Sequence, residues 1–122
     1  MTAEAIRDRV RAICLALPDV TEEGDQHLGF SVRGRRFAWF VDDHHGDGRV
    51  AIHCKAAPGE NTALVSAGTE RYFRPPYLAP RGWVGAWLDI EAIDWDRVEG
   101  LLVEAYRLAA PQRLAARLDA QG

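Results

Sequence analysis

The chain has 122 residues, 48% of them hydrophobic, and a formal net charge of −3. This length and composition fit one globular domain, over residues 1–122, and exclude a disordered chain. The negative charge argues against a general phosphate binder. The N-terminal residues show no basic region followed by an apolar run, and no apolar run approaches membrane-spanning length. We therefore expect a cytoplasmic monomer without a signal peptide or a membrane partner.

A first helix is predicted between Thr2, which can cap it, and Pro18, which ends it. Its apolar residues recur at helical spacing and should pack on a sheet. They are Ile6, Val10, Ile13, Cys14 and Leu17. The polar segment 19–27 is expected to be a loop. Cys14, on this stripe, and Cys54, on a later strand, are expected to be buried free thiols.

Two alternating runs, 28–33 and 36–41, flank Gly34 and predict a β-hairpin. In the second run, Phe37, Trp39 and Val41 should share one face. A polar loop, 42–48, then leads to a strand over 49–55 that completes a three-stranded meander.

A short helix is expected over 58–67, with Ala63, Leu64 and Ala67 in the core. A short aromatic strand follows and stops at Pro75-Pro76. The next strand begins at Trp83 and should turn its aliphatic residues inward. Trp83 and Trp87 then fall on the opposite, more exposed face, either as a binding surface or under another element.

Asp94 is expected to cap the last long helix, which Pro111 interrupts. A final piece containing Leu114 and Leu118 could continue as a short helix or fray. Strands grouped between helices indicate an α+β fold. We expect a five-stranded antiparallel sheet with the N- and C-terminal helices packed on one face and the opposite face open.

Several segments of the sequence resemble the MmcQ/YjbR family. They are Leu17-Pro18-Asp19-Val20-Thr21-Glu22, Tyr72-Phe73-Arg74-Pro75-Pro76-Tyr77, Arg81-Gly82-Trp83-Val84-Gly85, Leu88-Asp89, Asp94-Trp95, and 106–114. The resemblance implies a small α+β domain of the CyaY-like kind, whose members are often labelled DNA-binding because of a double-wing shape. It implies no catalytic motif. The helix near residue 60 is shorter and less charged than is usual in the family, which puts in doubt any contact made by that helix.

The residues themselves predict no enzyme, cofactor or metal site. No nucleophile elbow, phosphate loop or Cys-x-x-Cys motif is present. The loop 42–48 holds three Asp and two His, but their spacing matches neither an EF-hand nor a zinc motif, so we interpret it as a solvated loop. His27 and His53 stand alone in the sequence.

Arginines interleaved with aromatic residues form the most functional-looking pattern. Between residues 33 and 81 there are seven Arg and one Lys against five acidic residues. Arginine beside flat rings suits phosphate neutralisation and base stacking. The candidate binding residues are Arg33, Arg35, Arg36, Arg71, Arg74, Tyr77, Arg81, Trp83 and Trp87. The alternative without a binding role is that these aromatic residues belong to the core and the arginines solvate the sheet edge.

Two hypotheses follow. The first is a weak, non-specific DNA-binding module that uses the open sheet face and the 33–36 hairpin tip. The second is a non-enzymatic interaction domain in which Trp39, Trp83 and Trp87 receive a protein or an anionic small molecule. A continuous positive stripe would favour DNA, whereas an apolar pit rimmed by single arginines would favour a ligand or protein. An enzyme or metal protein is the weaker third possibility.

Overall fold

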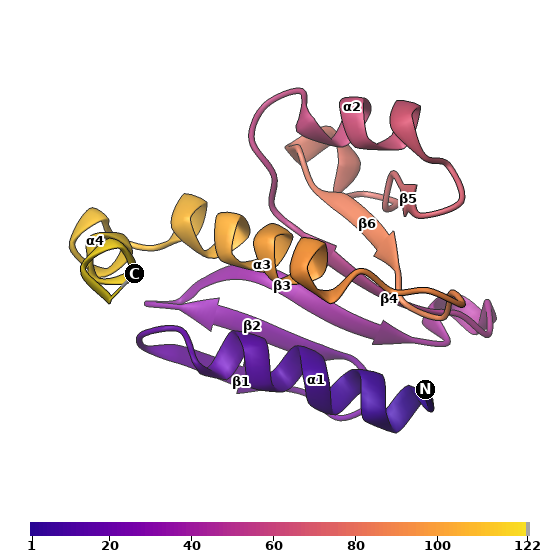
Figure 1. Cartoon of the computed structure of the whole chain (residues 1–122), viewed down its shortest axis with the longest axis horizontal. Coiled ribbons are helices and arrows are strands. Elements are labelled where there is room, and N and C mark those ends of the chain that lie inside the picture. The colour runs from indigo at the N-terminus through magenta and orange to yellow at the C-terminus, as the bar shows by residue number, and fades with distance from the viewer. Residues whose placement is uncertain (122) are drawn as a thin grey trace.

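A computed structural model describes residues 1–121 of the chain (Figure 1). Within this range the chain forms four α-helices, two short 3-10 helices and six strands. In chain order they are α1 (Ala3–Leu15), β1 (Val20–Glu23), β2 (Leu28–Val32), β3 (Arg35–Asp42), η1 (His44–Gly46), β4 (Val50–Cys54), α2 (Glu60–Ala67), β5 (Tyr72–Phe73), η2 (Ala79–Arg81), β6 (Val84–Trp87), α3 (Trp95–Ala109) and α4 (Gln112–Gln121). No helix in this range combines the length and the apolar character needed to cross a bilayer.

The six strands form one antiparallel sheet in the order β1-β2-β3-β4-β6-β5. The expectation of five strands was therefore wrong, because segment 19–27 was interpreted wholly as loop. Val20–Glu23 instead pairs with β2, from Val20 opposite Val32 to Glu23 opposite Gly29. Glu22 points to the helix side, where Arg11 of α1 holds its carboxylate at 2.6 Å. Glu22 and Glu23 place acidic side chains on both faces of the strand, so β1 lacks the alternation of apolar and polar residues that identifies a strand in a sequence.

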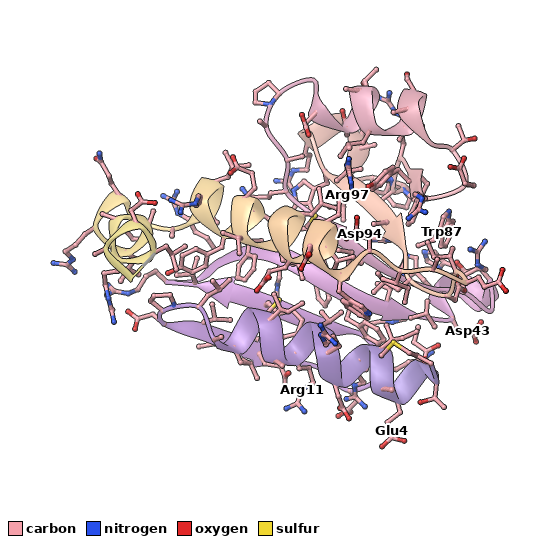
Figure 2. All side chains as sticks on the ribbon, viewed as in Figure 1. Glu4, Arg11, Asp43, Trp87, Asp94 and Arg97 are labelled. Atoms are coloured by element: carbon pink, nitrogen blue, oxygen red, sulfur yellow. The ribbon has the colours of Figure 1, made fainter. Side chains whose placement is uncertain are left out.

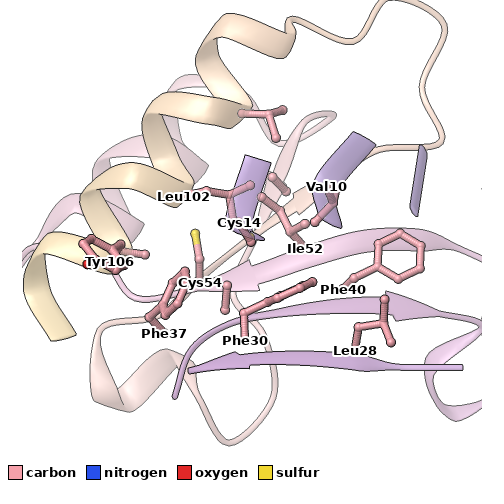
Figure 3. Close-up of a cluster of buried hydrophobic side chains, with 14 of the residues drawn as sticks. Val10, Cys14, Leu28, Phe30, Phe37, Phe40, Ile52, Cys54, Leu102 and Tyr106 are labelled. Atoms are coloured by element: carbon pink, nitrogen blue, oxygen red, sulfur yellow. The ribbon is translucent and has the colours of Figure 1, made fainter. Parts of the chain in front are cut away.

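Helices α1 and α3 pack against the same face of this sheet and enclose the core between them (Figure 3). Val10 and Cys14 from α1 meet Phe30 and Phe40 from the strands, and Leu102 enters from α3. The predicted helix caps are present: the Thr2 side chain accepts a hydrogen bond from the Ala5 N–H, and the Asp94 side chain accepts one from the Arg97 N–H. Burial of these apolar side chains is the main stabilising term for such a domain.

A register shift between β2 and β3 redirects one predicted side chain. It falls at Phe30/Ser31 and leaves Phe37 as an extra residue between Arg36, opposite Ser31, and Ala38, opposite Phe30. A β-bulge of this kind turns a side chain to the other face. Phe37 therefore lies in the core, edge-to-face with Tyr106 at 5.7 Å between ring centroids, and does not share a face with Trp39.

Helix α2 differs from its predicted packing. Asn61 is its buried residue, while Ala63 and Ala67 are exposed and Leu64 is half-buried. The Asn61 amide donates to the carbonyls of Ala79 and Trp83, both at 3.1 Å. The helix is thus held to the segment before β6 by a polar bridge, and of its three predicted core residues Leu64 packs against the core. The two cysteines are buried and free, as predicted.

Candidate ligand-binding site

The sheet face opposite α1 and α3 gathers all four histidines of the chain. His53 lies in the middle of β4, directly opposite Trp39 of β3, and His27 lies just before β2. The loop between β3 and β4 carries His44 and His45 over the same face. The ring of His44 lies 5.3 Å from that of His27, 4.0 Å from that of His45 and 5.6 Å from that of His53, measured between centroids.

These rings border a pocket of about 380 Å³, which we call the histidine pocket. It is lined by His27, Trp39, Val41, His44, His45, His53, Pro76, Tyr77 and Leu78. A second hollow of about 300 Å³ adjoins it, shares several of these residues and adds Asp47, Ala51, Phe73 and Trp87. Figure 2 places Trp87 and Asp43 at the same end of the molecule, away from α4.

Two aromatic stacks flank the histidine pocket. On one side, the Arg36 guanidinium lies 4.4 Å from the Trp39 ring centroid. On the other, Phe73 stacks on Trp87 at 4.0 Å, and the Arg49 guanidinium lies 3.9 Å from the same indole. Both arginines bind carboxylates as well, which fixes their positions: Arg36 binds Glu23 at 3.5 Å, and Arg49 binds Asp89 with two hydrogen bonds of 2.8 Å.

Two of the four imidazoles, His44 and His53, have lowered pKa values. Burial, together with the nearby His44 and His27, lowers the pKa of His53 to about 4. Burial, then His45 and His27, also lowers the pKa of His44, against the opposing effect of Asp47. Desolvation disfavours the charged form of an imidazole, and neighbouring rings add repulsion. His53 is therefore a neutral ring at pH 7.

A hydrogen bond sets the tautomer of His27. Its Nδ1 accepts from the backbone N–H of Asp42 at 3.2 Å, so a neutral ring carries its proton on Nε2. Such a ring cannot offer Nδ1 to a metal without losing this bond. Among the residues that the structure describes, no group of three or more His, Cys, Asp or Glu side chains is arranged to hold a metal ion.

The two loops that border the pocket hold strained backbone. Tyr77 has a φ of +67°, and Asp43 and His45 have φ values of +58° and +55°. Bulky residues rarely occupy this left-handed region, and such strain concentrates at binding and catalytic sites. The Tyr77 side chain is 86% exposed although it lines the pocket. Its ring therefore stands at the rim, where a ligand could cover it.

The comparisons with known proteins agree with this architecture. The family model described as YjbR matches residues 15–108. The chain belongs to the YjbR family. Protein DR2400 of Deinococcus radiodurans, which carries the domain DUF419, is 25% identical, with a TM-score of 0.70 over 84% of this chain and 76% of that one. A Pseudomonas syringae protein shares the fold at 11% identity, with a TM-score of 0.66 over 89% of this chain and 99% of its own. No curated protein matches the chain significantly.

YjbR membership confirms the resemblance found in the sequence, and the structure separates the predicted arginines into distinct places. Arg33 and Arg36 are paired with Asp19 and Glu23 at the hairpin, where Arg35 is exposed. Arg71 lies on the helix side, in a hollow with Asp94 and Arg97, two residues that Figure 2 labels at the start of α3. Arg74 donates to the Thr62 hydroxyl, and Arg81 is exposed at the end of η2.

Two of the predicted tryptophan surfaces are covered. Trp83 is only 6% exposed, and its backbone is held by Asn61 and by Leu78, whose carbonyl accepts from the Trp83 N–H. Of the two alternatives that the sequence left open for Trp83, a binding surface or cover by another element, the structure shows cover. The Trp87 indole is half-buried, with Phe73 and Arg49 against it. Of the three tryptophans proposed to receive a partner, Trp39 is the one that lines the histidine pocket.

Sequence reasoning missed the histidine cluster because its members come from three separate segments. The signal lay in the strand register. With β3 and β4 paired so that Trp39 opposes His53, the loop between them must return over the same face. The bulge at Phe37, between Arg36 and Ala38, is invisible in the alternation and obscured the register of β2 against β3, and with it the place of His27.

Proposed function

We propose that this YjbR-family domain is a non-enzymatic binding module that takes a small organic molecule into the histidine pocket. The observation that carries the proposal is the convergence of Trp39, Tyr77 and four imidazoles on one pocket of about 380 Å³. Small-molecule sites are concave, mostly apolar and range from about 300 to 1,000 Å³, with a few polar groups for orientation. The lining contains no Ser, Thr, Cys, Asp or Glu side chain, which supports binding rather than catalysis.

The charge distribution also favours a ligand pocket over a nucleic-acid surface. A continuous positive stripe would be needed to follow a phosphate backbone. Arg36 and Arg49, which rim the open face, are each bound to a carboxylate, and the centre of the face is apolar and aromatic. This is the pattern of an apolar pit rimmed by single arginines.

The test is a chemical-shift titration of isotope-labelled protein with a varied set of small organic molecules. We expect binders to shift the Trp39 indole N–H, the Val41 methyl groups and the histidine ring resonances together. Trp39→Leu should weaken these binders at least about threefold, the scale of one aromatic contact. Leu108→Ala, an exposed position on α3, serves as the matched control and should leave binding unchanged. Shifts confined to the helix side would contradict the proposal.

DNA binding is a second candidate, favoured by the exposed Arg35 beside the half-exposed Arg33 at the hairpin tip. Because the chain carries a net charge of −3, we expect dissociation constants in the micromolar range or above at physiological salt. Titrations at two salt concentrations test it. Arg35→Ala should reduce the salt slope by about one unit on any sequence, and Arg97→Ala, at the start of α3, should not. Unchanged slopes for both variants would remove this candidate.

A further inference from the structure

The charged groups around the histidine pocket have partners within the protein: the two acidic residues accept backbone hydrogen bonds, and the two arginines pair with carboxylates. Asp43 accepts a hydrogen bond from the Gly48 N–H at 2.6 Å, and Asp47 accepts one from the Arg49 N–H at 2.8 Å. The Arg49 guanidinium is held by Asp89, and that of Arg36 by Glu23. No charged side chain other than the histidines lines the pocket itself. An ionic ligand would therefore enter without a free counter-charge.

The buried imidazole of His53 does not supply that counter-charge. His53 is only 5% exposed, lies beside His44 and Phe73, and has a pKa of about 4 because of its burial. The lining of the pocket offers a cation no carboxylate, and the neutral ring of His53 offers an anion no positive charge. Burying an uncompensated charge costs far more than burying a hydrogen-bonded neutral group.

The shape and chemistry of the lining favour a flat molecule. Trp39, Tyr77 and the imidazoles present ring surfaces, while Val41 and Leu78 supply aliphatic contact. Aromatic surfaces prefer stacked or edge-to-face neighbours. His27, with Nδ1 occupied by the Asp42 N–H, has its Nε2–H left to donate. The pocket volume lies near the lower end of the range for small-molecule sites, which suits one or two rings.

From these observations we infer that the ligand of the histidine pocket is an uncharged, planar heteroaromatic molecule of one or two rings, with an acceptor atom that receives a histidine N–H. This inference rests on the proposed binding function and adds the ligand class. It departs from the anionic small molecule that the arginine content of the sequence predicts, because Arg36 and Arg49, the two arginines that flank the pocket, are bound to carboxylates.

Three probes that share one ring system test the charge. Quinoline-3-carboxamide is neutral, quinoline-3-carboxylate is an anion and 3-(aminomethyl)quinoline is a cation at pH 7.5. The readout is the shift of the Trp39, Val41 and histidine ring resonances during titration. We expect the carboxamide to bind at least about tenfold more tightly than either ion. An unpaired charge in the pocket costs more binding free energy than a single neutral contact contributes. Cyclohexanecarboxamide, neutral but not planar, should bind more weakly than the quinoline carboxamide.

Two variants locate the binding. Tyr77→Ala removes an exposed rim side chain, so the fold should persist, and it should weaken the carboxamide about threefold to tenfold. His53→Gln keeps a neutral polar group and should retain the preference for the neutral probe. Equal or tighter binding of the carboxylate at the same resonances would overturn the uncharged class while leaving the pocket as a binding site. If none of the probes moves these resonances at millimolar concentration, the proposed function fails together with the inference.

Discussion

The guanidinium of Arg36 occupies the space that a side chain on Gly29 would need. A Cβ at Gly29 would overlap Nη1 of Arg36 and would also approach the Trp39 ring to 2.9 Å. Nη1 of Arg36 is buried and has no hydrogen-bond acceptor, so the cation–π contact of the guanidinium with the Trp39 ring compensates for its lost hydration. The absence of a side chain at Gly29 on β2 therefore leaves room for the Arg36 guanidinium, which packs on Trp39 in one wall of the histidine pocket.

Gly29→Ala should displace Arg36 and destabilise the protein by about 1–3 kcal/mol, the usual cost of inserting a methyl group into a packed site. Denaturant unfolding measures this change. Gly100→Ala is the matched control, because a Cβ there meets nothing within 4 Å. It should stabilise α3 by about 0.5–1 kcal/mol. Equal effects of both substitutions would show that the close approach at Gly29 does not matter.

Burial of His53 should make stability depend on pH. Its pKa falls from the ordinary 6.5 to about 4 on folding, so between these values the unfolded ring binds a proton that the folded ring does not. The free energy of unfolding should therefore decrease as pH falls through this window, by up to about 3 kcal/mol, and should not change from this cause above pH 7.

Urea unfolding of the wild type and His53→Gln between pH 5 and 7 gives the measurement. The variant should show a flatter dependence, and His45→Gln, at an exposed ring of the same loop, should keep the wild-type slope. Identical slopes in all three proteins would assign the pH dependence to other groups.

The Asn61 bridge should be important for the segment that carries Tyr77. Its amide donates to the carbonyls of Ala79 and Trp83, and Asn61 is 5% exposed. Asn61→Asp keeps the size and removes both donors, so it should cost about 1–3 kcal/mol. Amide hydrogen exchange should also accelerate at Gly82 and Trp83, whose N–H groups bond within this segment. Unchanged exchange there would mean that the turn is held by its backbone alone.

Leu102→Ala should destabilise the protein by about 2–4 kcal/mol, because this fully buried side chain lies in the core between α3 and the sheet. Leu108→Ala, six residues further along the same helix but 42% exposed, should cost less than about 1 kcal/mol. Thermal or urea unfolding distinguishes the two. A loss below about 1 kcal/mol for Leu102→Ala would contradict its place in the core.

Much of the fold could be predicted because local signals agreed with one another. The caps Thr2 and Asp94, the turn at Gly34 and the apolar stripes of both long helices all appear where the sequence indicated. Strand β1 could not be predicted this way. Its Glu22 pairs with Arg11 of α1, and the local sequence of β1 gives no sign of this partner. The final α-helix after Pro111 was left open between helix and frayed end, and it is helical.

The site was harder to predict because it depends on distant pairing. Trp83 reads as an outward residue from strand alternation, yet contacts from α2 and the turn before β6 bury it. The arginines were identified as cations, but their partners Glu23 and Asp89 are 13 and 40 residues away in sequence. Arginines in a sequence therefore indicate a binding surface only after those that pair with acidic residues in the fold have been set aside.

The two edges of the sheet differ from its face in what they offer to another chain. Strand β5 has only two residues, and Pro75 and Pro76, which lack backbone N–H donors, follow it closely. Strand β1 has four residues and carries Glu22 and Glu23 at its end. Short strands, prolines and charges are the devices by which natural proteins prevent edge-to-edge aggregation. The protein can therefore keep an aromatic, partly apolar face open to solvent without its strands acting as a template for fibril growth.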